Sequence, residues 1–511
     1  MQNNFARICS VLKHVRFLTA FVLLVLLTAC QGPGPAPRSI YQNDVQDRQR
    51  NTNTDIKNTS SKTEASDSLG HNRAHPSIPD EPLSLSQAIR IGTARNPDVK
   101  TAVQRIQIAR ARLSQAEAAF YPQLSAGLSY TRTNHPAQGF FMTVAQREFD
   151  PRANVNDPGV NENYRTEVTL RYPIFRGGRD LNRAAAAEKR VRARDARRDA
   201  VENQLVYTIT EAYLSILSAR QQRVIAEKSL STVRAERDRV RKQADRGAAL
   251  ESDVQSLNVR LSDARRKKIR ARNAIEQARV ALKTLLADAS DRTVKIEKRG
   301  PESVGRSTPP RDDAIQAALS QRPEFESARY RVEALRKRLE AVKGERYPVL
   351  QTFGTYGHDN DAIEYTDQKD SWAAGIELEY KLFTGFSTRE KLREARHALR
   401  EARMQLKKTR LMIRKEVEKA LIRVDNRLAE LEVTEESVNS AREALRIVER
   451  QYEEGAVPVT RYLETETDLT RSRSKQKAAL YGVRKAQANL DRALGNNLTE
   501  HETQEQNQEA N

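Results

Sequence analysis

The sequence is short of aromatic residues and of cysteine. Only 5% of its 511 residues are Phe, Trp or Tyr, whereas 31% are charged. A chain with so few large apolar side chains buries little surface in one thick core, and this composition favours a long, thin, mostly helical architecture. The two cysteines are Cys9 and Cys30. Cys9 lies inside a predicted export signal, so the mature chain would hold at most one cysteine and no internal disulfide.

The sequence also lacks the motifs of catalysis. Its seven histidines are scattered without HExxH spacing, and no glycine-rich phosphate-binding pattern follows a predicted strand. Carboxylates are abundant, but they lie along charged helix faces, where solvation explains them. We therefore expect no enzymatic activity, no cofactor and no metal site.

The first 30 residues have the pattern of an export signal. Basic residues precede the apolar run FLTAFVLLVLLTAC, which is too short for a comfortable membrane span and ends in small residues. Its end, Leu27-Thr28-Ala29-Cys30, resembles the bacterial lipoprotein box, in which the cysteine is acylated and becomes the first mature residue. By analogy with such lipoproteins, Gln31 in place of Asp implies retention in the outer rather than the inner membrane. The alternative is an ordinary signal peptide with an incidental cysteine.

Two segments have the composition of disordered chain. Residues 31–82 are rich in Asn, Thr, Ser, Gly, Pro and Gln without hydrophobic periodicity, which predicts a flexible tether. Residues 498–511 are rich in Glu, Gln and Asn and predict a disordered tail.

The middle of the chain is an internal repeat. Repeat 1 covers residues 83–290, repeat 2 covers 312–497, and residues 291–311 link them. Tyr121-Pro122 recurs 226 residues later as Tyr347-Pro348, whereas landmarks beyond this point recur at an offset of 208. These later pairs are Phe175 and Phe383, Gly177 and Gly385, and Gly247 and Gly455. The change of offset places an 18-residue excess in one loop of repeat 1.

Each repeat predicts an antiparallel helical hairpin. Residues 179–246 contain neither Gly nor Pro, and their apolar positions are spaced alternately four and three residues apart, as in a coiled-coil seam. The same spacing recurs after residue 251 and in repeat 2. A turn that contains Gly247 in repeat 1, or Gly455 in repeat 2, separates the two seams.

Each repeat also predicts two strands of about ten residues with one apolar and one polar or charged face. The clearest examples alternate through residues 164–174 and 372–382. Such strands fit a transmembrane barrel with a wet interior, and the alternative is a soluble sheet packed on helices. Four strands cannot close a barrel in lipid, because their open edges would leave backbone groups unpaired. Either the sheet is soluble or several chains share one barrel.

These features together resemble the TolC-like outer-membrane efflux family. The resemblance covers residues 83–498 and comprises the doubled helix–hairpin–helix unit, the YP strand starts, the Phe-x-Gly strand ends and the two glycine-marked tips. It implies an internally duplicated α+β membrane protein. Three chains, with four strands each, would form one 12-stranded outer-membrane β-barrel, and long α-helices would continue it as a coiled-coil barrel in the periplasm.

The resemblance implies that the loops 134–163 and 358–369 face the cell exterior. It also implies roles for particular residues. The barrel lumen would be lined by Arg165, Glu167, Arg171, Glu377, Glu379 and Lys381. The strand–helix junctions would be Phe175, Gly177, Phe383 and Gly385. The periplasmic tip and gate would comprise Gly247, Asp253, Val254, Gly455, Arg461 and Glu464.

The gate has two interpretations. Family members often carry carboxylates at the constriction, and a threefold ring of Glu464 could hold cations there. Arg461 occupies the other such position, so it could pair with a neighbour instead. The alternative is that Glu464 is a solvated surface carboxylate.

The predicted function is therefore an outer-membrane exit duct of a tripartite efflux or type I secretion system. The resemblance implies a homotrimer that is lipid-anchored at Cys30 and meets a periplasmic adaptor, and through it an inner-membrane pump. The rival interpretation is a lipid-anchored periplasmic scaffold or adaptor without a pore. The net charge of +20 and the basic run at residues 265–272 are features that nucleic-acid-binding proteins share. An exported chain, however, does not meet the nucleic acid of the cytoplasm, so this function is not expected. The cargo stays open among drugs, metal ions and polypeptides.

Overall fold

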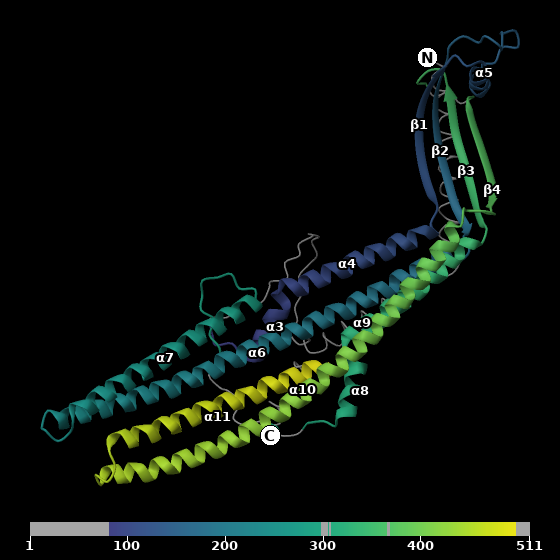
Figure 1. Cartoon of the computed structure of the whole chain (residues 1–511). Coiled ribbons are helices and arrows are strands. Elements are labelled where there is room, and N and C mark those ends of the chain that lie inside the picture. The colour runs from purple at the N-terminus through teal and green to yellow at the C-terminus, as the bar shows by residue number, and fades with distance from the viewer. Residues whose placement is uncertain (1–80, 298–304, 306–307, 365–367, 497–511) are drawn as a thin grey trace, which may run out of the picture. The chain divides into compact units, whose positions relative to one another are not determined.

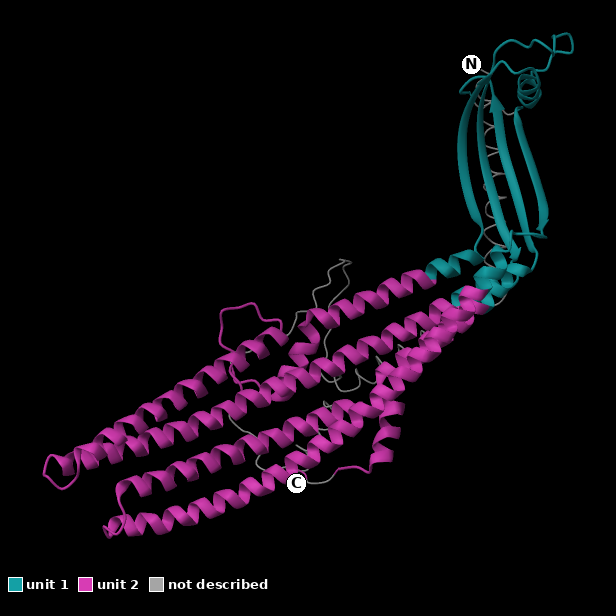
Figure 2. Ribbon diagram, in the orientation of Figure 1, with its two compact units in different colours: residues 1–72, 114–184, 340–392 teal, residues 73–113, 185–339, 393–511 magenta. Residues whose placement is uncertain are grey.

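The computed structural model describes residues 81–297, 305, 308–364 and 368–496. The predicted signal peptide with Cys30, nearly all of the tether, the tail and part of the inter-repeat linker lie outside these residues. The described chain divides into two compact units (Figure 2). Unit 1 contains residues 114–184 and 340–392, and unit 2 contains the described residues before 114, residues 185–339 and those from 393 onward.

Unit 1 is built around one antiparallel sheet (Figure 1). Its four strands lie in the order β1-β2-β3-β4, so the hairpin of repeat 1 pairs with the hairpin of repeat 2 through β2 and β3. The strands are β1 (Gln123–Thr133), β2 (Asn161–Phe175), β3 (Val349–Asn360) and β4 (Asp370–Glu379). Short 3-10 turns precede β1 and β3, namely η1 (Ala118–Phe120) and η2 (Gly344–Arg346).

The prediction that the last strand reaches residue 382 is wrong. β4 ends at Glu379, which pairs with Val349, the first residue of β3. Pro348 precedes Val349 and has no N–H to continue the ladder, so β4 loses its partner at this point. Lys381 consequently lies beyond the strand.

The predicted bounds of the two outer loops are also too wide. β2 already begins at Asn161 and β3 continues to Asn360, so both strands take up residues that were expected in loops. The longer loop of repeat 1 contains a helix that the sequence analysis did not predict, α5 (Pro136–Ala145). The excess residues of repeat 1 therefore carry structure of their own.

Most of the helices belong to unit 2 in whole or in large part. They are α3 (Leu85–Arg95), α4 (Pro97–Glu117), α6 (Arg179–Ala244), α7 (Glu251–Leu285), α8 (Arg311–Gln321), α9 (Pro323–Lys343), α10 (Ser387–Glu453) and α11 (Val459–Leu494). α6 and α10 have 66 and 67 residues, about 100 Å each at 1.5 Å per residue. Within the described ranges, no helix is both long and apolar enough to cross a membrane.

The predicted coiled-coil seams form the core of unit 2. Ile209 and Val417, at equivalent positions of α6 and α10, are fully buried, and so is Leu257 on α7. The four-three spacing brings these residues to one face of each helix, where they pack against the partner helix of the hairpin. The prediction of a helical hairpin in each repeat is confirmed.

Two short helices, α3 and α8, begin the two repeats and were not predicted. Ser84 caps α3 in a capping box with Gln87, which satisfies backbone N–H groups at the helix start. Leu83 pairs with Ile296 in a parallel bridge, and its carbonyl also accepts a 3.0 Å hydrogen bond from the hydroxyl of Tyr213. These contacts fix the start of repeat 1 against the end of the same repeat.

Candidate functional site

The polar face of the sheet carries most of the residues predicted to line a lumen. The strand register places Arg165, Glu167, Arg171, Glu377 and Glu379 on one face. Arg165 forms an ion pair with Glu167 and lies 3.4 Å from a carboxylate oxygen of Asp359. The sheet therefore has one continuous charged face.

Two further contacts of these polar residues lie within repeat 2, and one of them crosses between strands. Gln351 Nε2 donates a 2.7 Å hydrogen bond to Glu377 Oε2. Lys381, although outside the strand, lies 3.8 Å from the carboxylate of Glu379. Glu377 therefore has a neutral hydrogen-bond donor, and Glu379 has a cation beside it.

Phe353 is the exception on the polar face, and its neighbour explains it. Phe353 pairs directly with Gly375 on β4. A Cβ atom at Gly375 would lie 2.9 Å from Cζ of the Phe353 ring, so the ring covers the bare glycine backbone. An aromatic ring over a strand glycine covers the backbone that a side chain at that position would otherwise cover.

The opposite face of the sheet is apolar and uncovered. Leu128, Trp372 and Ile376 have exposed fractions of 73%, 75% and 71%. The register places the following residues together on this face: Leu124, Ala126, Leu128, Val168, Leu170, Leu350, Ala374, Ile376 and Leu378. An exposed apolar area of this extent marks a lipid or protein contact.

Aromatic residues border the apolar face toward both ends of the strands. Near the α5 end, the rings of Tyr130 and Tyr164 lie 4.8 Å apart between centroids, and Tyr356 pairs with Trp372 on the next two strands. At the other end are Tyr121, Tyr172, Phe175, Tyr347, Tyr380 and Phe383. Two aromatic girdles around an apolar band are the pattern of outer-membrane β-barrels.

Both edges of the sheet are open within the described chain. β1 and β4 each pair with one neighbour only. In hydrocarbon every unpaired backbone N–H or C=O costs several kcal/mol, so an open apolar sheet needs further strands to pair with.

α5 packs on the polar face through a buried polar cluster. Gln146, which caps α5, donates hydrogen bonds of 2.6 Å to the carbonyl of Glu162 and 3.0 Å to Asn163 Oδ1. Asn163 in turn donates a 2.7 Å bond to Asp359 Oδ1. Phe141, on another side of α5, is 69% exposed. The loop of repeat 1 thus lies against the face predicted to line the lumen.

The two strand–helix junctions differ although their sequences are equivalent. Gly177 and Gly385 both have positive φ, at 65° and 58°. A Cβ at Gly177 would lie 2.3 Å from the carbonyl oxygen of Gly344, whereas a Cβ at Gly385 would meet nothing within 4 Å. Phe175 ends β2 and is 48% exposed, and Phe383 is 74% exposed. The contact with Gly344 was not predicted from the sequence.

The predicted tip glycines form the two hairpin turns. Gly247 and Gly455 have φ of 73° and 75°, the left-handed conformation that favours glycine. Asp253 lies in the first turn of α7, where a carboxylate is favourable to the helix dipole. Val254 is 1% exposed and packs with Leu463, so it belongs to the core of the tip and not to its surface.

Arg461 and Glu464 lie one helical turn apart on α11. Their side chains are 62% and 56% exposed, and the nearest charged atoms are 3.7 Å apart. Within the chain, Arg461 thus lies within ion-pair distance of Glu464. Such an exposed pair contributes little to stability.

A buried carboxylate, Glu466, lies two residues further on and was not predicted. It is 8% exposed, and burial raises its pKa above the usual value. The helical spacing offers a signal, because Glu466 lies three residues after Leu463 and seven after Val459, on the face that these buried apolar residues share. Among the described residues, no group of His, Cys, Asp and Glu could hold a metal ion.

A pair of strands followed by a long helical hairpin occurs twice in this chain, and the two pairs share one sheet with an apolar and a charged face. The sequence profile of the outer membrane efflux proteins matches residues 89–288 and 314–496, which is more than half of the chain. The chain belongs to the outer membrane efflux protein family. The two matched ranges correspond to the two repeats.

Known proteins agree with this assignment. The chain is 23% identical over 374 residues to the alkaline protease secretion protein AprF of Pseudomonas aeruginosa. The aligned region covers 70% of this chain and 73% of AprF. The chain is 22% identical over 424 residues to the probable outer membrane lipoprotein SilC of Salmonella typhimurium, with 81% and 86% covered. The solved structure of CusC, a transmembrane channel, superposes with a TM-score of 0.71 at 19% identity, over 81% of this chain and 92% of that one.

These findings confirm the main predictions for this outer membrane efflux protein. The fold is that of an internally duplicated channel protein with a four-stranded sheet and long helices in each chain. The protein is located in the outer membrane, extends into the periplasm and provides an exit duct. Members of the family are channels, and the alternative of a scaffold without a pore is set aside.

Proposed function

We propose that three copies of this efflux protein join their sheets into one closed barrel of 12 strands. The open edges of β1 and β4 support this assembly, because each would gain a partner strand from a neighbouring copy. The exposed apolar face with its aromatic borders would contact lipid, and the face with Arg165 and Glu167 would contact water. This two-faced open sheet is the observation that carries the proposal.

We infer that transport through the duct is passive. The energy would come from an inner-membrane pump, which a periplasmic adaptor connects to the hairpin tips. The turns at Gly247 and Gly455 are the exposed ends of the two hairpins and would offer the docking surface. The cargo stays open among drugs, metal ions and polypeptides, and the similarity to an alkaline protease secretion protein supports polypeptides.

We further propose that Cys30 carries a lipid. The sequence around Cys30 supports this modification, and the similarity to a probable outer membrane lipoprotein agrees with it. The lipid would anchor the mature N-terminus, with the tether allowing it to reach the membrane. Mass spectrometry of the purified N-terminal peptide would show the added acyl chains, and an unmodified Cys30 would contradict the proposal.

The test of the duct combines assembly with conductance. Outer-membrane fractions should yield a heat-resistant trimer, and the purified trimer should conduct ions in planar bilayers. The Cys30→Ser variant should still form this trimer, because the barrel and not the lipid holds the chain in the membrane. A mature protein that stays monomeric and dissolves without detergent would contradict the proposal.

At the tips we propose that Glu464 forms a ring that holds cations. Its exposure and its place next to the turn support this role, and the proximity of Arg461 would moderate the charge of each carboxylate. Glu464→Ala should remove block of the conductance by divalent cations, whereas Arg461→Ala should strengthen it. Unchanged block in both variants would contradict the ring.

A further inference from the structure

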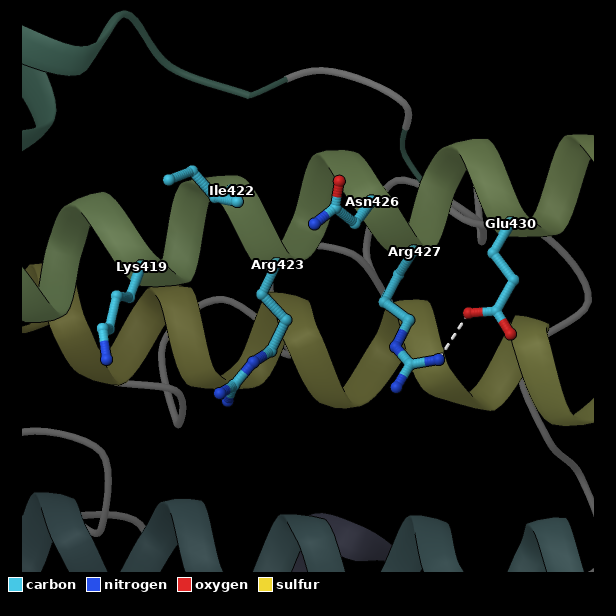
Figure 3. A pocket seen from close by; sticks show the side chains of 6 residues that line it. All are labelled: Lys419, Ile422, Arg423, Asn426, Arg427 and Glu430. Atoms are coloured by element: carbon cyan, nitrogen blue, oxygen red, sulfur yellow. Dashed lines mark hydrogen bonds and ion pairs between the residues drawn. The ribbon is translucent and has the colours of Figure 1, made fainter.

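A groove on α10, with a volume of about 490 Å³, is a surface that water alone can cover (Figure 3). An ion pair joins Arg427 to Glu430 at one end of it. Its full lining is Lys419, Ile422, Arg423, Asn426, Arg427 and Glu430. All of these side chains except Ile422 are charged or polar, and such side chains are ordinarily solvated. The groove therefore gives no ground for a ligand.

The helix α5 presents the opposite kind of surface. Its ten residues, PAQGFFMTVA, include no charged side chain. Gly139, Met142 and the capping Gln146 are buried and share the side that lies against the sheet. Phe141 and Val144, on the opposite side, are 69% and 45% exposed. A helix that is apolar on nearly all sides is normally buried all round, so this exposed side lacks a partner within the described chain.

Contacts with both hairpins of the sheet hold α5 over the polar face. A Cβ atom at Gly139 would overlap the side chain of the first residue of β2, so the glycine lets the helix approach this strand closely. Arg147 Nη2 donates a 2.9 Å hydrogen bond to the carbonyl of Asp370 on β4. Lys369 forms an ion pair with Glu148. The helix is thus fixed to both repeats, at the end of the sheet where β2 begins and β3 ends (Figure 1).

We propose that the α5 helices of three copies meet at the centre of the barrel mouth and close it with an apolar plug. The proposal rests on the trimer proposed above and adds what closes its outer end. In that trimer the polar face lines the lumen, so the exposed side of α5 points away from the wall and toward the threefold axis. Phe141 and Val144 would then face the same residues of the other two copies.

Lipid is the other apolar partner that an exposed helix could have, and the position of α5 argues against it. The apolar face of the sheet, with Leu128 and Ile376, lies opposite to the face that carries α5. A helix without its counterparts would leave Phe141 in the aqueous lumen, where exposed apolar area is unfavourable. Contact among three helices removes this area from water in every copy, and no charge on α5 has to be desolvated.

The size of the mouth fits three helices. A barrel of 12 strands that are about 4.8 Å apart and tilted by about 40° is about 24 Å across between opposite backbones. An α-helix with its side chains is about 10 Å across, so three helices in mutual contact span about 22 Å. The three α5 helices would therefore nearly fill the opening. Such an apolar constriction excludes ions because water does not wet it, and the duct would stay closed from outside until the helices separate.

Cysteine cross-linking tests whether the three helices meet. In the Phe141→Cys variant, oxidation of the purified trimer should give a covalent dimer, well above the background of the parent chain with its Cys30. The control is Leu128→Cys, which is similarly exposed in the single chain but lies on the apolar face. Equivalent positions on the barrel wall are about 20 Å apart in neighbouring copies, beyond the reach of a disulfide.

Labelling from outside tests whether the plug closes the lumen. Gly127→Cys places a thiol on the polar face, about 20 Å along β1 from Thr133, the last residue of that strand. A membrane-impermeant maleimide that is too large for general porins should label this thiol slowly on intact cells. Adding Phe141→Ser should make the labelling several-fold faster, because it removes the apolar contact. Val155→Ser is the matched control, since Val155 is an exposed apolar residue of the same loop outside α5, and it should leave the rate unchanged.

The outcomes separate the plug from the barrel. An assembled trimer, verified by light scattering, in which Phe141→Cys does not cross-link would overturn the meeting of the helices. A labelling rate that Phe141→Ser leaves unchanged would overturn the closure of the mouth. Protection of the Phe141→Cys thiol from the maleimide without any cross-link would place α5 against lipid and likewise overturn the plug. Absence of any trimer would instead contradict the proposed function.

Discussion

The hydroxyl of Tyr452 on α10 donates a 2.7 Å hydrogen bond to Oε1 of Glu236 on α6. The ring of Tyr452 also stacks on Tyr462 at 5.3 Å between centroids, and the guanidinium of Arg239 lies 5.2 Å from its centre. Burial, together with the bond to Glu236, raises the pKa of Tyr452 well above its usual value. The hydroxyl therefore stays protonated and joins the hairpins of the two repeats near their tips.

Replacement of Tyr452 by Phe should loosen this junction. Glu236 is only 9% exposed, so loss of its donor leaves a buried acceptor unsatisfied, at a cost of about 1–3 kcal/mol. Hydrogen exchange of the purified trimer should become faster at the tip ends of α6 and α10. Tyr462→Phe is the matched control, because the Tyr462 hydroxyl makes no hydrogen bond within the described chain. Equal exchange in both variants would show that the bond does not hold the hairpins together.

Glu466 should make the tip sensitive to pH. Burial raises the pKa of Glu466, while Thr470 donates a 3.0 Å hydrogen bond to one of its oxygens. The cations Lys267, Arg473 and Arg260 lower the pKa by smaller amounts. Because the folded protein favours the protonated form, this residue contributes stability below the pKa of the unfolded chain. That stability is lost as the pH rises through the higher pKa of the folded state.

Glu466→Gln should therefore raise the thermal stability of the trimer at pH 8 more than at pH 5. The thermal midpoint measured in detergent at both pH values gives the comparison. Asp468→Asn, on the same helix with an exposed side chain, serves as the control and should not change the difference between the two pH values. A gain for Glu466→Gln that is the same at both pH values would contradict the role of its titration.

The helices were largely predictable because their pattern is local. The four-three spacing that includes Ile209 and Val417 specifies a buried face whatever the partner helix is, and both residues are fully buried. The alternation along the strands likewise specified which residues share a face. These features follow from the period of the backbone, 3.6 residues for a helix and two for a strand.

The features that the sequence did not reveal depend on partners far away in the chain. β4 ends at Glu379, which pairs with Val349, because Pro348 before Val349 has no N–H to continue the ladder. Glu466 shares a helix face with Val459 and Leu463, but only the packing of the neighbouring helices shows that this face is closed over a carboxylate. α5 packs through Gln146 on a cluster that includes Asp359, more than 200 residues away. Such contacts require the tertiary arrangement.

The two junction glycines should respond differently to alanine. Gly177 and Gly385 both have left-handed backbone conformations, so alanine costs about 1–2 kcal/mol at either position. At Gly177 the new methyl group would also lie 2.3 Å from the carbonyl oxygen of Gly344, and this backbone atom cannot move away independently. Gly177→Ala should therefore lower the thermal midpoint of the trimer considerably more than Gly385→Ala. Equal losses would mean that conformation alone matters at both junctions.

Lysine placed on either face of β1 tests which face meets lipid. Leu128 is 73% exposed on the apolar face near the middle of the strand. Leu128→Lys should destabilise the barrel by about 2–4 kcal/mol, because the charge would lie near the bilayer midplane, and less folded trimer should be recovered from the outer membrane. Gly127→Lys puts the same charge on the polar face, opposite Glu167 and with no atom within 4 Å of the new Cβ, so it should be tolerated. The reverse result, with Gly127→Lys lost and Leu128→Lys retained, would place the charged face against lipid and contradict a wet lumen.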